Sequence, residues 1–446
     1  MAKVNGLSKE SIEKRKTQRQ NLQSIGYHEY AYKFCIYVDK AQREFLNKSI
    51  GCVRFIYNKM LYLSEENYKN YEFTWNIYDY KKLIPEFKKI YPFLKECPSQ
   101  ALQETVWALD NAYKKYLKGE SNKPVFKKKK NGGSIHIPQG WRLEYIGNKF
   151  GKLYIPKLKT PLRVRMHINI NETPKSITIV KESSGEFYAV FFCIRKIEKL
   201  PNTNKAIGID LGITNYITTS QMDLLEKNIK HNKTANPKHL KKSIKKLKRL
   251  YRQLSRKQHP RAKDDKTLKS NNFIKHAKKV AKLHKKVKNQ RLDFLHKISK
   301  AIIDENQVIV AEDLNIKGMI KNKYLAQSIS DVSWGKFLRM LEYKAKWYGR
   351  KFVKINRAYP SSKLCFCGYK NNALKLSDRV WICPKCGRFY DRDEHAADMV
   401  LLEGITQVGL ERPELTPVER ALVDDRVQQW IPKKPSFVEA GSLSLQ

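Results

Sequence analysis

The chain has 446 residues, 41% of them hydrophobic, so it is long enough for two or three domains with separate cores and is not disordered as a whole. No apolar run approaches the ~18 residues of a membrane span, and the polar N-terminus lacks the apolar core of a signal peptide, so we expect a cytoplasmic protein. The net charge of +46 predicts nucleic acid as the partner, because each phosphate that a lysine or arginine neutralises releases counterions.

The N-terminal half predicts a small β-barrel that is interrupted by helices. Residues 1–30 are polar and are expected to be flexible. A strand is predicted at 32–38, and amphipathic helices are predicted at 41–68 and 99–119, where apolar residues recur every three or four positions. From 134 to 195 the apolar period changes to two, which is typical of antiparallel strands. Because one strand precedes the helices and the others follow them, the helices are interpreted as an insertion into the barrel.

Residues 236–305 are expected to form a pair of basic helices. Apolar residues keep their helical spacing within KKSIKKLKRL (241–250), and the break between the helices is predicted at HPRAKDD (259–265). A charge run is often only a solvated helix face, but the excess of one sign here favours contact with phosphates. The candidate contacts on the first helix are Lys241, Lys245, Arg249 and Arg252.

Acidic residues stand near the ends of two apolar strands. Asp210 lies within AIGIDLGITNY (206–216), where a lone carboxylate is costly unless it binds a metal or meets a cation; the alternative is an acid that caps a turn. The second strand, in VIVAEDLNIKGM (308–319), ends in Glu312 and Asp313. Side chains alternate along a strand, so only one of these two can share a site with Asp210. Position alone does not choose between them.

A third acidic stretch, DRDEHAADMVLL (391–402), begins an apolar helix. Asp393 is a good helix N-cap there, and this structural role is its alternative. Acids at two strand ends and one helix start are together what a two-metal phosphodiesterase needs. Hard oxygen ligands favour Mg²⁺ or Mn²⁺ over softer metals.

Four of the eight cysteines fall close together, as Cys365-x-Cys367 and Cys383-x-x-Cys386. Two close pairs of thiolates suit tetrahedral Zn²⁺, and such crowding in an intracellular protein argues against disulfides. The first pair is one residue shorter than the usual C-x-x-C, so partial ligation or a vestigial site is the alternative. Four protein ligands leave no position for water, which predicts a structural zinc and not a catalytic one.

Several of these stretches, in this order, resemble the TnpB family of transposon-encoded proteins, which are related to type V CRISPR effectors. The resemblance rests on GIDLGITN (208–215), VIVAEDLNIKGM (308–319), SSKLCFCGYKN (361–371), CPKCGRFYDRDEHAAD (383–398), and the segments 32–61 and 98–119. It implies a multidomain α+β protein. A wedge β-barrel would carry an inserted helical recognition lobe, and a RuvC-like (RNase H-type) α/β nuclease domain would be interrupted by a zinc ribbon.

The resemblance and the composition together predict the domain boundaries. They are a flexible N-terminus at 1–30, the wedge barrel at 31–40 and 121–203, the recognition lobe at 41–120, the first nuclease part at 204–360 with its basic helices at 236–305, the zinc ribbon at 361–390, the last nuclease segment at 391–402, and a flexible tail at 403–446.

The resemblance also implies an activity. The family's catalytic acids correspond to Asp210, Glu312 and Asp393, and the resemblance alone chooses Glu312 over Asp313. His395 stands where the family usually has Asn, which leaves the local support of the site open. The implied function is an Mg²⁺-dependent, RNA-guided endonuclease in the prokaryotic cytoplasm, associated with the nucleoid. It would cut double-stranded DNA beside a short adjacent motif, with a guide RNA from the transposon end.

Two other functions compete with this one. The first is an RNA-guided DNA-binding repressor whose nuclease is weak or lost. The second is a transposase that joins DNA ends, which is disfavoured because no HxH motif lies near a helix tyrosine.

Nucleic-acid contacts are also expected in the N-terminal half. Near the adjacent motif, the candidates on the recognition helices are Tyr57, Asn58 and Lys59, although a tyrosine on a helix face is more often in a core. The run KPVFKKKK (123–130) adds Lys127 and Lys128 as backbone contacts, with a flexible charged loop as the alternative.

Overall fold

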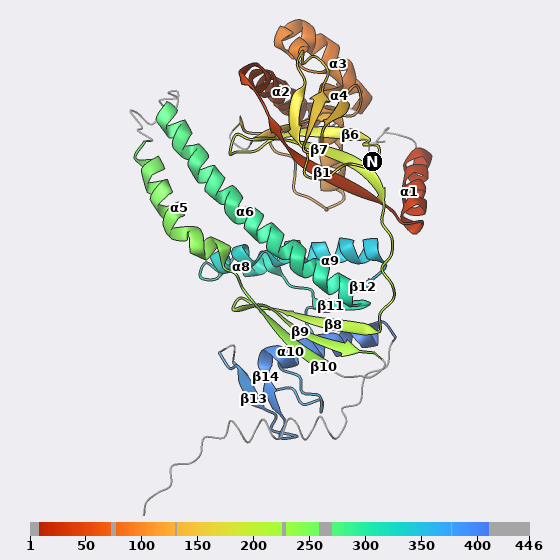
Figure 1. The fold of residues 1–446 in the computed structure, drawn as a ribbon, viewed down its shortest axis with the longest axis vertical. Coiled ribbons are helices and arrows are strands. Elements are labelled where there is room, and N and C mark those ends of the chain that lie inside the picture. Colours follow the sequence, from red (N-terminus) through yellow and green to blue (C-terminus); the bar gives the residue numbers. More distant parts are fainter. Residues whose placement is uncertain are drawn as a thin grey trace, which may run out of the picture. The chain divides into compact units, whose positions relative to one another are not determined.

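The computed structural model describes residues 9–72, 77–129, 132–224, 229–257, 270–375 and 377–409 (Figure 1). Clustering of contacts divides the chain into two compact units, which are 1–198 with 245–286, and 199–244 with 287–446. None of the helices in the described ranges is long and apolar enough to cross a membrane. The predicted helix break at 259–265 lies outside the described residues. The flexible tail predicted at 403–446 starts too early, because the helix α10 (Arg392–Gln407) includes its first residues, and the part beyond residue 409 is not described.

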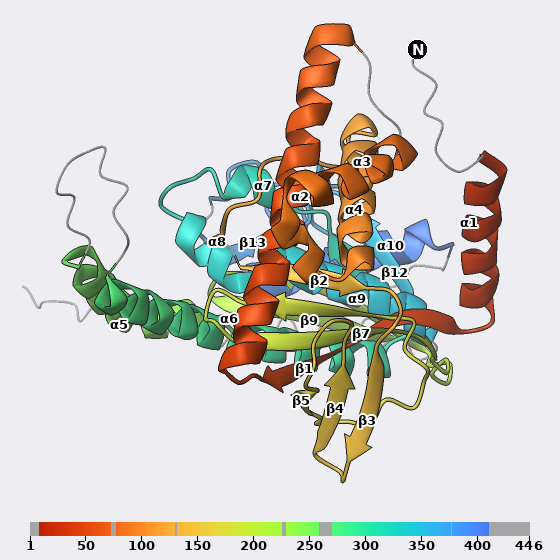
Figure 2. The same cartoon turned by 90° about the horizontal axis from the view of Figure 1, so that it is seen from above.

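The first unit is built on a seven-stranded antiparallel sheet. Its strands are β1 (Tyr27–Tyr37), β2 (Gly133–Ile137), β3 (Arg142–Ile146), β4 (Phe150–Tyr154), β5 (Leu162–Arg165), β6 (Ser176–Lys181) and β7 (Phe187–Lys196). Their order is β2-β6-β7-β1-β5-β4-β3, which places the first strand of the chain in the middle of the sheet. Figure 2 shows β3 and β4 projecting as a hairpin. The sheet is a curled, open form of the predicted barrel.

Helices interrupt this sheet between β1 and β2, as predicted. They are α2 (Lys40–Tyr71), α3 (Ile77–Ile90), the 3₁₀ helix η1 (Pro92–Glu96) and α4 (Ser99–Leu117). Asp39 and Gln42 start α2 with a capping box, in which each side chain accepts from the other's backbone N–H at 2.8 and 3.1 Å. The apolar face of α2 then packs into one core with α4 and the sheet, so the insertion is part of the same folded unit.

The N-terminal segment differs from its prediction. Residues 1–30 are expected to be flexible, but α1 (Lys9–Ser24) is a helix and β1 already begins at Tyr27. Gly26, with φ of +86°, makes the turn between them. The sequence of α1 has almost no apolar stripe, and apolar periodicity is the signal that identifies a helix from sequence. A polar helix of this kind is therefore easily mistaken for an irregular segment.

The second unit contains a five-stranded mixed sheet. Its strands are β8 (Lys205–Leu211), β9 (Asn215–Asp223), β10 (Ile229–Ala235), β11 (Val308–Glu312) and β12 (Lys351–Ile355). In the order β10-β9-β8-β11-β12, β9 is antiparallel to both of its neighbours, β10 and β8, whereas β11 is parallel to both β8 and β12. This α/β arrangement agrees with the predicted RuvC-like domain.

Helices cover both faces of this sheet (Figure 1). Ile207, Ile209 and Ala311 belong to a core shared with α9 (Trp334–Tyr348), whereas Ala206 and Val310 belong to a core shared with α10 (Arg392–Gln407). The alternation of side chains along β8 and β11 therefore assigns even-numbered residues to the α10 face. Two short helices, α7 (Ile316–Met319) and α8 (Ala326–Val332), follow β11.

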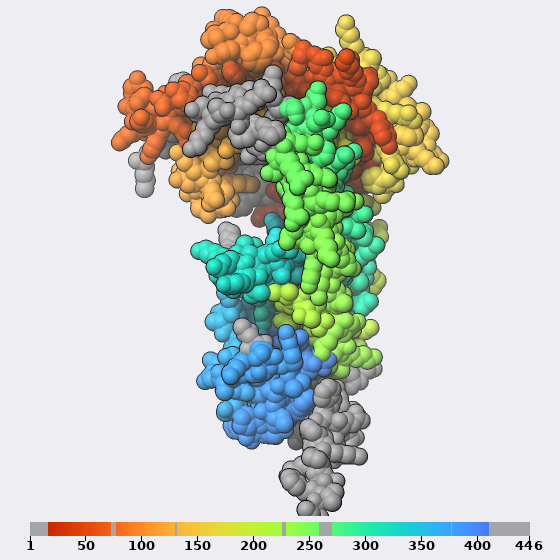
Figure 3. Space-filling view, turned by 90° about the vertical axis from the view of Figure 1, so that its left-hand side faces the viewer, coloured from red at the N-terminus to blue at the C-terminus, as the bar shows by residue number. Residues whose placement is uncertain are grey.

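The two remaining long helices and a small hairpin complete the fold. The predicted pair of basic helices is present as α5 (His239–Ser255) and α6 (Asn271–Glu305), and the boundary between the units falls within both. Leu247 is the one buried residue of α5, so nearly all of its basic side chains face solvent (Figure 3). The hairpin of β13 (Val380–Ile382) and β14 (Phe389–Asp391) precedes α10 and carries the second pair of cysteines at its turn.

Candidate functional site

The register between β8 and β11 brings two carboxylates together. The parallel pairing aligns Ala311 with Ile209, so Glu312 is in register with Asp210 at the carboxyl ends of both strands. Both residues are even-numbered and lie on the α10 face of the sheet, where Val310 belongs to the α10 core. Asp313 has the opposite parity, and its carboxylate is instead held by Arg357, with Nη2 2.6 Å from Oδ2. The geometry thus distinguishes Glu312 from Asp313, which strand position alone could not do.

The third carboxylate comes from the start of α10. Asp391 is the N-cap of this helix, because its Oδ1 accepts from the backbone N–H groups of Asp393 and Glu394 at 3.0 and 3.1 Å. The interpretation of Asp393 as the cap is therefore wrong. Its side chain is not used for capping, and Arg379 Nη1 lies 3.5 Å from Asp393 Oδ1.

Two glycines allow α10 to lie directly on the strands. A Cβ at Gly208 would come within 2.4 Å of the Ala397 carbonyl oxygen, and a Cβ at Gly404 would come within 2.2 Å of a Val310 methyl group. No larger residue fits at either contact without moving the helix away from the sheet. This close packing places the first turn of α10 next to the strand that carries Asp210.

The charges of the three carboxylates act on one another. The pKa of Asp210 is raised to about 7, first because burial disfavours its charged form and then because Glu312 and Asp393 carry charges of the same sign. Burial also raises the pKa of Glu312, although a hydrogen bond donated by Ser361 Oγ opposes this rise. A divalent cation would offset the repulsion that these acids experience.

The carboxylate oxygens of the three acids are the kind of ligand that Mg²⁺ prefers. These oxygen atoms are spaced more widely than those of a single compact ligand cluster. Among the described residues, the cysteines alone form a group of three or more potential ligands whose atoms all lie within 4.8 Å of one another. A centre that holds two ions about 3.5–4 Å apart spreads its carboxylates over a larger space than that. The hard oxygen ligands and the mutual repulsion of the three acids suit a divalent cation.

The four cysteines converge as the sequence predicts. Cys365 Sγ lies 3.3 Å from Cys367 Sγ and 3.5 Å from Cys386 Sγ, and Cys367 Sγ lies 3.7 Å from Cys383 Sγ. The turn of each pair is closed by a glycine N–H that donates at 2.9 Å to the carbonyl of its first cysteine. The shorter C-x-C pair therefore still presents both sulfur atoms. Four thiolates at this spacing suit tetrahedral zinc and leave no position for water.

His395 connects this cysteine cluster to α10. Its Nε2 lies 2.7 Å from the carbonyl oxygen of Leu364, and its ring packs against Tyr390 with centroids 4.0 Å apart. Tyr390 in turn places its hydroxyl 3.0 Å from Cys365 Sγ. His395 is buried and faces the ribbon, so it supports the start of α10 from that side. Neither this link nor the Arg379 contact was predicted from the sequence, where no local pattern signals them.

The predicted contacts on the recognition helix behave differently from one another. Tyr57 is only 6% exposed, with the Lys127 ammonium 3.7 Å from its ring centroid, so the prediction that it contacts nucleic acid is wrong. Asn58 is occupied by the backbone of Lys127, since its Oδ1 accepts at 2.8 Å and its Nδ2 donates at 3.1 Å. Lys59 is half-buried, and Lys128 is exposed. Burial of the Lys127 ammonium group lowers the pKa of that side chain.

The predicted phosphate contacts on α5 are all accessible. Lys241, Lys245, Arg249 and Arg252 are exposed, and in the described part of the chain none of these side chains forms an ion pair with an acid. Their charges are therefore available to an external anion.

Family models match three segments of the chain. Residues 189–323 match a model described as "Probable transposase", residues 334–400 match "Cas12f1-like, TNB domain", and residues 29–72 match "Helix-turn-helix domain". In this structure the last segment consists of most of β1 followed by the single long helix α2.

Whole-chain relatives agree with these matches. A Streptomyces pristinaespiralis protein is 33% identical over 84% of this chain and 89% of its own length, and Escherichia coli K12 InsQ is 28% identical over 84% and 92%. Both carry the name "Putative RNA-guided DNA endonuclease". The fold resembles the protein in the cryo-EM structure of a Cas12f1–sgRNA–target DNA complex, with a TM-score of 0.52, 15% identity, and coverage of 88% of this chain and 86% of that one.

Proposed function

Because the chain belongs to the TnpB family of transposon-encoded proteins, we propose that it is an RNA-guided DNA endonuclease. Its substrate is double-stranded DNA beside a short adjacent motif, and a guide RNA from the transposon end supplies the sequence through base pairing. The reaction is hydrolysis of a phosphodiester bond in a two-metal centre. It acts in the prokaryotic cytoplasm on nucleoid DNA.

The observation that supports this proposal is that three acids from distant parts of the chain are near enough for their charges to act on one another. Asp210, Glu312 and Asp393 come from β8, β11 and α10, and burial together with the charges of the other two acids raises the pKa of Asp210. Structural acids are normally paired with cations or caps, whereas neither Asp210 nor Glu312 forms an ion pair with a cation among the described residues. The three side chains would hold Mg²⁺ or Mn²⁺, which when bound activates a water and stabilises the leaving oxygen.

Neighbouring side chains orient these acids. Ser361 Oγ donates to Glu312 Oε1 and fixes one of its oxygens, which leaves the other for the centre. Asp391 fixes the first turn of α10, and with it the position of Asp393. Arg379, 3.5 Å from Asp393, places positive charge at the rim of the centre, where a phosphate would enter.

The cysteine cluster and the exposed basic side chains have supporting roles. Zinc held by Cys365, Cys367, Cys383 and Cys386 is structural and stabilises the ribbon that precedes α10. Exposed cations of α5, together with Lys59 and Lys128, contact phosphates of the guide RNA and the target, because shape and backbone recognition suits an A-form duplex whose sequence is read by pairing.

A plasmid-cleavage assay with the co-expressed transposon-end RNA and Mg²⁺ tests this function. Asp210→Ala is expected to reduce cleavage by more than about 100-fold while target binding persists, because losing a metal ligand costs more than losing its outer support. Asp313→Asn is the matched control, since this adjacent acid faces away and pairs with Arg357. It is expected to cleave like the wild type. Equal cleavage by Asp210→Ala and the wild type would contradict the assignment.

The same assay separates the rival function, an RNA-guided repressor. The observation in its favour is that the three carboxylates are spaced more widely than a single compact ligand cluster. A wild-type protein that binds the target but leaves it uncut at all Mg²⁺ and Mn²⁺ concentrations would establish the repressor.

A further inference from the structure

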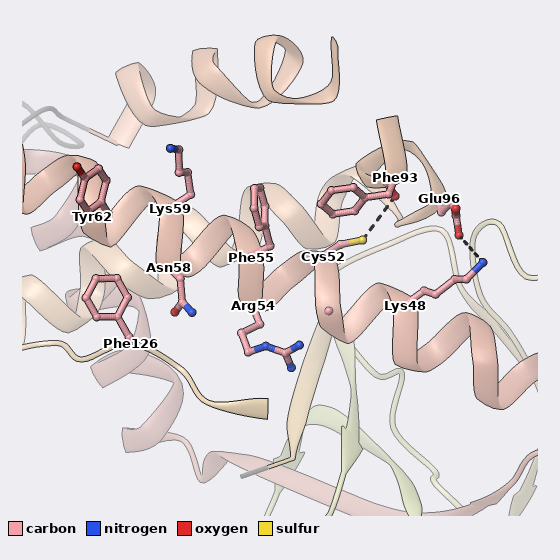
Figure 4. A pocket seen from close by; sticks show the side chains of 11 residues that line it. Lys48, Cys52, Arg54, Phe55, Asn58, Lys59, Tyr62, Phe93, Glu96 and Phe126 are labelled. Atoms are coloured by element: carbon pink, nitrogen blue, oxygen red, sulfur yellow. Dashed lines mark hydrogen bonds and ion pairs between the residues drawn. The ribbon is translucent and has the colours of Figure 1, made fainter. Parts of the chain in front are cut away.

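A groove of about 730 Å³ lies along α2 in the first unit and has no role in the carboxylate or cysteine sites (Figure 4). Its volume falls within the range of ligand-binding clefts. One wall is α2 itself, a second comes from Phe93 and Glu96 of η1, and a third comes from Phe126 in the segment that follows α4. We refer to it below as the α2 groove.

Aromatic rings line the α2 groove and remain open to solvent. Tyr62, Phe93 and Phe126 are 47%, 44% and 46% exposed. Phe55 is held in place by edge contacts, with ring centroids 5.4 Å from Phe93 and 4.8 Å from Tyr91. Figure 4 shows Tyr62 and Phe126 at one end of the groove and Phe93 toward the other. Exposed rings in a concave site are suited to a flat ligand such as a nucleobase, which stacks on aromatic faces whatever its sequence.

Positive charge accompanies these rings. Lys48 lies in the groove and pairs with Glu96 at 3.2 Å, which neutralises the single acid of the lining. Figure 4 shows Lys59 extending from α2 on the same side as Phe55 and Arg54 extending on the other side, and within the described ranges neither forms an ion pair with an acid. The lining therefore keeps net positive charge beside its rings, which is the combination that a nucleotide with its phosphate requires.

The wall that carries Phe126 is held in a fixed position. Lys127, the next residue, is bonded through both backbone groups to the side chain of Asn58, and its ammonium lies over the Tyr57 ring. These contacts explain why the Tyr57 ring is buried and why the Asn58 amide already has partners. They also mean that the groove is formed before a ligand arrives, which reduces the entropy cost of binding.

We propose that the α2 groove binds one unpaired nucleotide, whose base stacks on the aromatic side chains and whose phosphate is contacted by Lys59, which extends on the same side of α2 as Phe55. The proposal rests on the proposed function only in taking nucleic acid as the partner. A paired base is excluded by its own neighbours in the duplex, so the nucleotide must come from a single-stranded stretch. Unpaired guide RNA and displaced DNA strand offer the same chemistry, and the experiment below separates them.

Gly51 offers a way to fill the groove without disturbing the fold. It lines the groove from within α2, and a Cβ there would meet only the Arg54 Nη2 atom, at 4.0 Å. Leu and Ala both favour a helix interior more than Gly does, so neither variant should weaken α2. Gly51→Leu adds a side chain that extends into the groove, and Gly51→Ala is the matched control that adds only a methyl group.

The test uses the full chain and oligonucleotides of about ten residues that carry one 2-aminopurine, whose fluorescence is quenched by stacking. RNA and DNA single strands are titrated beside the corresponding duplexes. Gly51→Leu is expected to weaken single-strand binding about tenfold and to abolish the quenching, whereas Gly51→Ala behaves like the wild type and duplex binding does not change. The strand with the larger loss, RNA or DNA, identifies the natural source.

Unchanged single-strand binding and quenching in Gly51→Leu would overturn the proposal, and so would an equal loss for duplex and single strand. Asp210→Ala is included so that the nuclease assignment is judged separately. It is expected to keep the quenching, because the carboxylate centre takes no part in the groove. A protein that stacks the base but never cuts would therefore contradict only the proposed function.

Discussion

At the scale of single residues, the central feature is a carboxylate placed where its charge is unfavourable. Burial of Asp210 on its strand, together with the like charges of Glu312 and Asp393, raises the pKa of this carboxyl group to about 7. A group of this kind retains its proton in the folded state while the unfolded chain has lost it, so stability is lost as the pH rises from about 4 toward 7. The site thus trades stability for a cation-binding function.

Replacing this carboxylate with an amide therefore has a pH-dependent effect. In Mg²⁺-free buffer, Asp210→Asn is expected to be more stable than the wild type at pH 8, by up to about 4 kcal/mol, because the amide carries no charge to bury. The difference should shrink as the pH falls toward 4. Urea unfolding at pH 5 and pH 8 measures it, and a variant that is less stable than the wild type at pH 8 would contradict the electrostatic account.

His395 is a second residue whose replacement is informative. His395→Ala removes the donor to the Leu364 carbonyl and the ring that packs on Tyr390, so we expect a loss of about 2–4 kcal/mol in stability and faster loss of zinc to a chelator. His395→Gln is the control, because its amide N–H reaches nearly the same point as Nε2. If the Ala and Gln variants released zinc at the wild-type rate, His395 would have no part in supporting the ribbon.

At the scale of elements, close contact between α10 and the sheet fixes the site. Gly208 and Gly404 let the helix backbone reach β8 and the side chain of Val310 in β11, and the cap at Asp391 fixes the direction of its first turn. The position of Asp393 therefore depends on residues that never touch the reacting atoms.

Gly208→Ala tests this dependence. The added methyl group would lie 2.4 Å from the Ala397 carbonyl, so α10 must shift, and we expect a loss of about 1–3 kcal/mol in stability together with a loss of cleavage. Thermal unfolding and the plasmid assay measure the two effects. Gly51→Ala, where the new methyl group meets open space, should be neutral or stabilising. An active and equally stable Gly208→Ala would show that the close approach is not required.

Elements with strong apolar periodicity were predictable from the sequence. The buried stripe of α2 and the alternation in β6 and β7 each reflect a single face packed on a core, and they lie where the patterns indicated. The helix α1 was missed because it carries little apolar pattern, and the alternative role of Asp393 as the cap of α10 was two residues too late because three acids stand within four residues. Both errors arise where the local sequence is equally compatible with two structures, a polar helix or an irregular segment in the first case and one capping acid or another in the second.

The site was only partly predictable for a related reason. Pairing of Asp210 with Glu312 depends on the register of two strands about a hundred residues apart, which no local pattern encodes. Burial of Tyr57 depends likewise on the segment at Lys127, which packs across it. By contrast, the cysteine cluster was predictable, because the ligand spacing of a metal site is itself local.

At the scale of the whole molecule, the excess of 46 positive charges requires a polyanion. Part of the positive charge on the 89 lysines and arginines is neutralised within the protein, as at Lys297 and Lys300, which pair with Asp293 and Asp304 on the same helix. Another part, on α5, is left without an acidic partner among the described residues. The cations of α5 that have no acidic partner are the ones that should contribute to binding of nucleic acid.

The salt dependence of binding distinguishes the two kinds of charge. The double variant Lys245→Gln, Arg249→Gln is expected to reduce the slope of log K against log salt by about 2, because each lost phosphate contact accounts for about 0.9. The control, Lys297→Gln with Lys300→Gln, removes the same charge from locally paired positions and should change the slope little. Equal slopes for both double variants would indicate that net charge, and not the α5 face, governs binding.

The most direct test of the central claim is to locate bound metal. Crystals of the full chain soaked in Mn²⁺ and measured at the manganese absorption edge would reveal each ion by its anomalous signal. The account predicts ions about 2.1–2.2 Å from carboxylate oxygens of Asp210, Glu312 and Asp393, with none in an Asp210→Asn crystal. Manganese bound elsewhere, with these three acids left unliganded, would contradict it.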